Sequence, residues 1–244
     1  MNMLKNLQQQ NFHDIVKKMH SVSGWEMLES DNFLALKSPA KVPFINFVWA
    51  EANAKNHIKA EAFFGIHSFA WLLTAEQDDD YLVSVGFHEP ENSPEMVIEL
   101  ANYHSVELSS KIKIIVADAE QDFQCWARVA SETFGPTPAE ISEFFLPLVQ
   151  HAGCIPYLAF YDGEPAATSL AFCGEKVAGI YAMNTHSQFR CKGLGGAVAQ
   201  ACLVNAKNNG CDFAVLYASE VGKLLYEAMG FQTAQVLKEY GSKK

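Results

Sequence analysis

Hydrophobic and polar positions along the chain switch between helical and strand-like spacing, and their order predicts two successive units of mixed α and β structure. In the first half the apolar residues follow helical spacing near the N-terminus and strand-like runs bounded by turn residues afterwards. The elements expected there are a helix over about residues 1–20, strands at 32–38 and 42–50, a helix at 51–64, and strands at 68–74 and 96–100.

The second half has a clearer pattern, because turn residues separate its apolar runs. Asp162-Gly163 and Gly174-Glu175 join three strand-like runs into a meander. The elements expected are a strand at 112–118, helices at 122–134 and 137–152, strands at 155–162, 165–173 and 176–185, a helix at 194–208, a strand at 213–219, a helix at 222–229 and a strand at 231–240.

An internal repeat supports a division into two units. Residues 69–87 align without gaps on residues 213–231, with identical residues at six of nineteen positions. Each copy has the pattern of a strand, a short helix and a Gly-Phe pair that opens another strand. We therefore predict a duplicated unit, with domains at 1–109 and 110–244.

Composition excludes several classes of protein. The chain has 244 residues, 49% of them hydrophobic, but no run approaches the roughly 18 consecutive apolar residues of a membrane span. Its N-terminus has no apolar stretch typical of a secretory signal, and its six cysteines form no C-x-x-C pair. We expect a cytoplasmic protein with reduced thiols and no membrane association.

Metal binding has little support in the sequence. The eight histidines are scattered without H-x-x-x-H or H-E-x-x-H spacing. The run Asp78-Asp79-Asp80 lacks the ligand spacing of an EF-hand and is typical of a solvated helix start. We expect no metal site.

The charge is concentrated in the first half. Residues 1–109 hold 7 Lys and 15 Asp or Glu, a net charge of −8, and residues 110–244 contribute the remaining −2 of the total of −10. An acidic surface repels phosphate backbones, so nucleic acid is not an expected partner. The only two arginines of the sequence are Arg128 and Arg190.

Arg190 belongs to a glycine-rich stretch, residues 188–207, in which Gly193, Gly195 and Gly196 open a predicted helix. A helix start presents unpaired N–H groups and the positive end of the dipole, and glycine lets an anion approach them. Arg190 and Lys192 add positive charge. The stretch fits neither a Walker A loop nor a dinucleotide fingerprint. Close packing of a strand and a helix is the alternative explanation of the glycines.

Two motifs together resemble the GNAT superfamily of N-acetyltransferases. "QFRCKGLG" (188–195), between a predicted strand and helix, resembles the [Q/R]-x-x-G-x-[G/A] motif, and "LYEAMGF" (225–231) resembles a frequent later segment. The element order from 112 to 240 is similar to that of the superfamily. Ser187 and Ser219 depart from residues common in the superfamily, proline and asparagine respectively. The resemblance implies a mixed α/β, acyl-CoA N-acyltransferase-like fold.

The resemblance also implies acetyl-CoA as co-substrate and direct attack of an amine on the thioester, with a small molecule, an amino acid or a peptide as the amine acceptor. Tyr226 matches the tyrosine that serves as general acid in many members; packing of its ring is the alternative. The residues that the resemblance places at the cofactor are Met183, Asn184, Thr185, Arg190, Cys191, Lys192, Gly193, Leu194, Gly195, Gly196 and Ser219.

The general base and the acceptor remain open at this stage. His186, Glu175 or a chain of water molecules could serve as the base, and Tyr181, Glu132 and His151 could line the acceptor pocket, although each could equally be structural. A homodimer is one assembly that the sequence leaves open.

The first unit lacks the residues that would bind a cofactor. Residues 41–52, which correspond to 185–196, contain a proline and no glycine, and Leu82 stands at the place of Tyr226. We therefore predict a degenerate copy that helps to wall the acceptor pocket. The alternative function is a non-catalytic module of the same fold that binds a cationic partner through its acidic first half.

Overall fold

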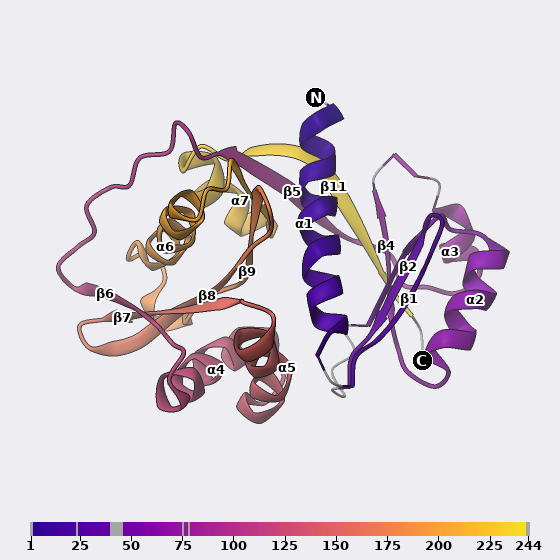
Figure 1. Ribbon diagram of the computed structural model, residues 1–244, viewed down its shortest axis with the longest axis horizontal. Helices are drawn as coiled ribbons and strands as arrows, with labels where there is room; N and C mark the ends of the chain where they lie inside the picture. The colour runs from indigo at the N-terminus through magenta and orange to yellow at the C-terminus, as the bar shows by residue number, and fades with distance from the viewer. Residues whose placement is uncertain (1, 23, 40–45, 75, 78, 243–244) are drawn as a thin grey trace.

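All strands of the protein join one mixed sheet. The computed structural model describes residues 2–22, 24–39, 46–74, 76–77 and 79–242. Within them the eleven strands lie in the order β1-β2-β3-β4-β11-β5-β10-β9-β8-β7-β6, and helices cover both faces of the sheet (Figure 1). The mixed α/β fold expected from the sequence is confirmed.

The first half contains three helices and five strands among the described residues. The predicted helices and strands are present, and β1 is an addition that the hydrophobic pattern did not indicate. Part of the predicted strand at 42–50 lies outside the described residues. The elements are α1 (Asn2–His20), β1 (Glu26–Ser30), β2 (Phe33–Lys37), β3 (Phe47–Ala50), α2 (Ala54–Phe64), β4 (Ala70–Thr74), α3 (Asp80–Ser84) and β5 (Glu91–Glu99).

In the second half every predicted element is found within a few residues of its expected bounds. Thr137 begins α5 with a capping box, in which its hydroxyl and the Glu140 carboxylate satisfy backbone N–H groups at the helix start. The elements are β6 (Ile112–Val116), α4 (Glu120–Phe134), α5 (Pro138–His151), β7 (Ile155–Tyr161), β8 (Glu164–Cys173), β9 (Val177–Thr185), α6 (Leu194–Asn208), β10 (Phe213–Tyr217), α7 (Glu220–Ala228) and β11 (Gln232–Gly241).

The two halves repeat one arrangement. β3 and β4 pair in parallel over three residues, Phe47–Trp49 with Ala70–Leu72, and β9 and β10 pair in parallel over three residues, Val177–Gly179 with Phe213–Val215. A helix connects each pair, and a second helix and an antiparallel strand follow it. The duplication predicted from the sequence is therefore present in the fold. The predicted correspondence of 41–52 with 185–196 is wrong, because β3 takes the place of β9 and the residues between β3 and α2 take the place of the loop before α6.

The last strand of each half lies within the other half. β5 pairs with β10 and β11, and β11 pairs with β4 and β5. The two strands cross the middle of the molecule side by side (Figure 1). The sheet is consequently continuous across the proposed boundary at residue 109, which stays a prediction.

Helix α1 also joins the two halves. Its Asn11 side chain, fully buried, donates to the Val177 carbonyl at 2.7 Å and accepts from the Tyr181 hydroxyl at 2.6 Å. A Cβ at Gly179 would lie 2.1 Å from the Asn11 Oδ1 atom, so this position requires glycine. One hydrophobic core includes residues of α1, α4 and α5 together with β3 and β4. α6 and α7 pack on the opposite face of the sheet.

The acidic run before α3 has a structural role that the sequence did not indicate. The Asp79 carboxylate accepts hydrogen bonds from the Lys238 ammonium and the Tyr240 hydroxyl of β11. These contacts lower the pKa of Asp79, with the bond from Lys238 as the largest cause. Asp79 therefore ties the first half to the exchanged C-terminal strand, whereas Asp78 lies outside the described residues.

Candidate functional site

The centre of the site is the gap where β9 and β10 diverge. Their parallel pairing ends at Gly179 and Val215, but β9 continues to Thr185. Ala182 has a φ of 48°, and the pairing of β9 with β8 shifts register beside it, as in a β-bulge. The edge of β9 that faces β10 is thus open from Ile180 onwards, and an extended ligand can pair with it as an added strand.

The three strand residues predicted to bind cofactor lie at this gap. Met183 packs on the α6 side of the sheet, whereas Asn184 is buried on the α4 side. The Asn184 amide donates to the Val129 carbonyl at 2.5 Å and its oxygen accepts from the Thr133 hydroxyl. These bonds anchor the diverging end of β9 to α4, so its open edge is held in place.

The predicted anion loop continues directly from this strand. A short 3₁₀ turn, Ser187–Phe189, leads to Cys191 and Gly193, which have φ values of 59° and 82°. Gly193 is the N-cap of α6, and no side chain caps the helix there. The N–H groups of the first turn have no intrahelical partner, so they are available to an anion.

Gly195 and Gly196 lie in that first turn against α7. A Cβ at Gly195 would lie 3.1 Å from the Leu225 Cδ2 atom and 3.6 Å from the Thr185 hydroxyl oxygen. The end of a leucine side chain can move by a few tenths of an ångström. Both explanations of these glycines therefore have support, because the packing is close and the amides are also accessible.

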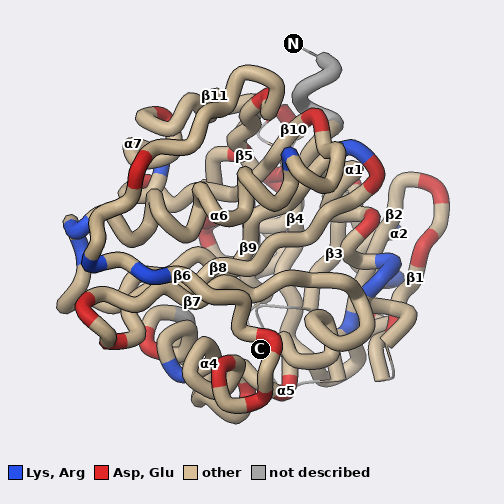
Figure 2. Tube along the Cα trace, turned by 60° about the vertical axis from the view of Figure 1, so that its left-hand side comes forward, with Lys and Arg blue, Asp and Glu red and all other residues tan. Residues whose placement is uncertain are grey.

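Cations surround the loop. The Arg190 Nε atom donates to the Thr185 carbonyl at 3.3 Å, and the Lys192 ammonium lies 4.7 Å from the centroid of the Tyr161 ring. Lys111 approaches the same ring at 5.6 Å. Figure 2 shows basic residues grouped near β6, at this end of a largely acidic molecule.

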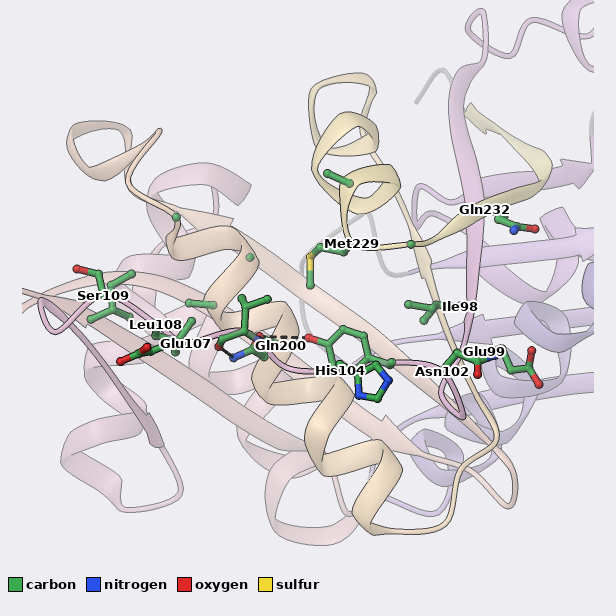
Figure 3. Close-up of a pocket in the computed structure, with 18 of the residues that line it drawn as sticks. Ile98, Glu99, Asn102, His104, Glu107, Leu108, Ser109, Gln200, Met229 and Gln232 are labelled. Atoms are coloured by element: carbon green, nitrogen blue, oxygen red, sulfur yellow. Dashed lines mark hydrogen bonds between the residues drawn. The ribbon is translucent and has the colours of Figure 1, made fainter.

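A cavity of about 830 Å³ adjoins the start of α6. Lys192, Gly193 and Gly196 contribute to its wall, together with the segment 102–109 and the turn between α7 and β11 (Figure 3). The Gln200 side chain holds this segment in place, because it accepts from the Val106 N–H at 2.8 Å and donates to the Val106 carbonyl at 2.9 Å. The sequence did not indicate this cavity, because 101–109 has neither helical nor strand-like spacing.

Tyr226 projects from α7 into the core between α6, α7 and the sheet. The residue is 6% exposed, and burial raises the pKa of its hydroxyl to about 12. The group is therefore protonated at neutral pH and can donate a proton. Ser219 is the N-cap of α7, and its hydroxyl accepts from the Gly222 N–H at 3.1 Å. The roles predicted for both residues stay predictions.

The other candidates fall into two groups. Tyr181 lines a cavity between the two halves, and His186 follows β9 with its Nε2 atom 2.8 Å from the Glu132 carboxylate. Glu175 lies in the turn before β9, at the opposite end of that strand from the gap, and His151 is exposed at the end of α5. The structure therefore separates Glu175 and His151 from the site.

The sequence did not indicate the carboxylate of Glu95 near the gap. Glu95 of β5 is 1% exposed and is directly opposite Tyr217, the last residue of β10. Burial raises the pKa of Glu95 to about 7, although the side chains of Gln235 and Tyr217 oppose this shift. The hydrophobic pattern before Met96 did not predict that Glu95 is buried. Its burial depends on α1 and on the exchanged strands, which are distant in the sequence.

Among the described residues no group of three or more His, Cys, Asp or Glu could hold a metal ion. Within the same residues no helix is long and apolar enough to cross a membrane.

Comparison with known proteins relates most of the second half to a known family. Residues 118–231 match the model of the acetyltransferase (GNAT) family. No curated protein sequence matches the chain with significance.

Solved structures of the same fold cover both halves. A GCN5-related N-acetyltransferase from Kribbella flavida aligns with 99% of this chain and 95% of its own, at 17% identity and a TM-score of 0.72. Another GCN5-related N-acetyltransferase, from Sphaerobacter thermophilus, aligns with 99% of this chain and 90% of its own, at 12% identity and a TM-score of 0.64. A tandem GNAT protein from the clavulanic acid biosynthesis pathway aligns with 98% of this chain and 92% of its own, at 10% identity and a TM-score of 0.63. These likenesses show a tandem fold.

Proposed function

We propose that the protein transfers the acetyl group of acetyl-CoA to an amine by direct attack, a reaction that the match of residues 118–231 to the GNAT acetyltransferase family supports. The observation that carries the proposal is the uncapped, glycine-rich start of α6 beside the open edge of β9. An anion site and an extended slot therefore meet at one point, as a pyrophosphate with a pantetheine arm requires.

The residues fit this ligand along its length. The pantetheine arm pairs with the backbone of Met183, Asn184 and Thr185, and the N–H groups of residues 191–196 hold the pyrophosphate. The cations of Arg190 and Lys192 add attraction for its charge. The cavity of about 830 Å³ beside Gly193 and Gly196 has room for the adenosine end.

The chemistry requires a neutral amine, a stabilised carbonyl oxygen and a proton for the leaving thiolate. A backbone N–H of β9 near the bulge at Ala182 supplies the hydrogen bond to the oxygen. Tyr226 supplies the proton, and its buried hydroxyl stays protonated at neutral pH because its pKa is raised to about 12.

The first half does not bind a second cofactor. In it, Trp71 fills the space between α2, α3 and the sheet, and its indole donates to the Ala50 carbonyl at 2.8 Å, at the end of β3. Leu82 stands where the second half has Tyr226. Aromatic packing therefore occupies the region that corresponds to the cofactor gap.

The test combines binding with a search for the acceptor. Calorimetry measures acetyl-CoA binding, and a thiol-release assay screens amines of different chemistry. Gly195→Glu should abolish binding, because it places an anion at the pyrophosphate position. Gly195→Ala adds the same Cβ without the charge and is the control for packing against Leu225.

If folded Gly195→Glu binds acetyl-CoA as tightly as the wild type, the proposed site is wrong. If the wild type itself does not bind acetyl-CoA, the non-catalytic module becomes the better explanation.

A further inference from the structure

A second cavity, of about 320 Å³, lies between the two halves on the face of the sheet opposite α6 and α7. Helices α1 and α5 cover it, and strands β3, β4 and β11 form part of its wall. Its lining is mainly aromatic and aliphatic, and includes Phe12, Phe47, Leu72, Phe144, Leu148 and Leu237.

This cavity reaches the gap between β9 and β10. Tyr181 and Ala182 of β9 and Tyr217 of β10 form part of its lining. Under the proposed function the thioester lies in that gap, so a molecule in the cavity faces the acetyl group from the side opposite α6 and α7. The cavity has the position that an acceptor needs.

The charge of the cavity lining is negative. Among its described lining residues Glu239 carries a carboxylate, and none is Lys, Arg or His. Burial and, secondarily, the neighbouring Glu91 raise the pKa of Glu239, and no cation of the described residues pairs with it. A site of this kind attracts an ammonium ion and disfavours a carboxylate or a phosphate.

A group of buried polar side chains adjoins the cavity through Tyr217. The Glu95 Oε1 atom, the Tyr217 hydroxyl and both polar atoms of the Gln8 side chain are buried. The Tyr217 hydroxyl interacts with the side chains of Gln8 and Glu95, and Tyr217 itself lines the cavity. Polar groups therefore connect the apolar cavity with the buried carboxyl of Glu95.

Glu95 and Tyr217 are close enough to exchange a proton. They are directly opposite on paired strands, where Cβ atoms lie about 4.5–5.5 Å apart. Two residues along the same strands, Val97 and Val215 contact Leu7 of α1, so Glu95 and Tyr217 face the same side of the sheet as α1. Tyr217 lines the cavity, whereas Glu95 is buried and is not among the lining residues.

We infer that this cavity binds the acceptor, that the acceptor is a primary amine on an apolar and otherwise uncharged body, and that Glu95 takes up the ammonium proton through the Tyr217 hydroxyl. This inference rests on the proposed acetyl transfer. The volume suits one ring with a short alkyl amine, since about 150 Å³ already holds a benzene ring. Glu239 attracts the ammonium into the cavity.

The protons and bonds balance. The ammonium gives one proton to the Tyr217 hydroxyl, which passes its own proton to the Glu95 carboxylate. The neutral nitrogen attacks the carbonyl carbon, a C–N bond forms and the C–S bond breaks. The thiolate takes a proton from Tyr226, and the second proton leaving the nitrogen restores Tyr226. The proton on Glu95 returns to water after the amide leaves.

The surroundings of Glu95 support this role. Tyr217 from β10 and, next to it, Tyr181 from β9 are the ionisable groups nearby, whereas Gln8 from α1 and Gln235 from β11 are uncharged. Burial raises the pKa of Glu95 to about 7, which is close to the optimum for a base at neutral pH.

A panel of amines tests the acceptor class. We expect 2-phenylethylamine to be acetylated with a kcat/KM about 100-fold higher than phenylalanine, which adds a carboxylate, and than glucosamine, which has a polar body. Equal or better acetylation of either polar amine overturns the acceptor class. It leaves the proposed acetyl transfer intact, so the two failures are distinguishable. If no amine reacts, both proposals fail.

The pH dependence tests Glu95 with the best apolar amine. In the wild type, log kcat/KM should rise and level off near pH 7. In Glu95→Gln and in Tyr217→Phe it should instead rise without a plateau towards the amine's own pKa of about 10, with about a 100-fold loss at pH 8. Glu120→Gln, which removes an exposed carboxylate at the start of α4, is the control and should keep the wild-type profile.

Retention of the inflection near pH 7 in folded Glu95→Gln and Tyr217→Phe would overturn the proton route. Should one of the two fail to fold, the other decides.

Discussion

Replacement of Glu95 by Gln is expected to stabilise the protein at neutral and alkaline pH but not at pH 5. Burial is the main cause that raises the pKa of this carboxyl to about 7 from its ordinary 4.5. Between these two values the folded protein holds a proton on Glu95 that the unfolded chain has released. Stability due to this group is therefore full below about pH 4.5 and is lost as the pH rises through 7.

The magnitude follows from the size of the shift. One pKa unit corresponds to about 1.4 kcal/mol, so a shift of roughly 2.5 units makes the ionised folded protein about 3 kcal/mol less stable at pH 8. Gln has the same shape and no charge, and its oxygen can still accept the hydrogen bond that Gln235 donates to Glu95. The penalty should therefore disappear in the variant.

Urea unfolding of both proteins at pH 5, 6, 7 and 8 measures the effect. All other groups titrate alike in the two proteins, so the difference in their free energies of unfolding isolates Glu95. It should grow by about 2.5 kcal/mol from pH 5 to pH 8, because a small part of the penalty is already present at pH 5. Glu120→Gln removes an exposed carboxylate at the start of α4 and serves as the control. If the difference in the free energy of unfolding stays constant over this pH range, Glu95 is not a buried carboxyl with a raised pKa.

Three further outcomes are expected. Tyr226→Phe should lower kcat about 100-fold with little change in the KM for acetyl-CoA, and an unchanged kcat where chemistry limits the rate would reduce Tyr226 to a packing residue. Calorimetry should give one acetyl-CoA per chain, and two would contradict the loss of binding by the first half. A chain of residues 110–244 should not fold, because β5 is missing between β10 and β11; a soluble, cooperatively folded fragment would show that the exchange is dispensable.

Much of the fold could be predicted because its elements follow local rules. Apolar spacing and turn residues predicted the helices and most strands, and the match of 69–87 with 213–231 predicted the duplication. β1 escaped because its five residues, Glu26–Ser30, are mostly exposed or half-buried and lack clear alternation. The exchange of β5 and β11 was not predicted either, because strand pairing between distant segments leaves no local signal in the sequence.

The candidate site divides in the same way. The glycines at 193, 195 and 196 could be singled out because three glycines in four positions at a helix start let a ligand approach the backbone. Glu95 could not be found, because an isolated glutamate in a strand has the composition of an ordinary surface residue. Its burial depends on α1, 75 or more residues earlier, and on β10 and β11, more than 110 residues later.

Under the proposed function, the strand exchange lets the first half take part in the reaction without a cofactor site of its own. β5 places Glu95 opposite Tyr217 of the second half, and α1 closes the same face through Asn11. Asp79 fixes β11 to the first half through Lys238 and Tyr240, which holds Glu239 at the cavity. The proposed cofactor slot depends on the second half, whereas the cavity proposed for the acceptor is lined by side chains of both halves. A change of acceptor is therefore expected from substitutions in α1, β4 or β5 that leave the acetyl-CoA slot untouched.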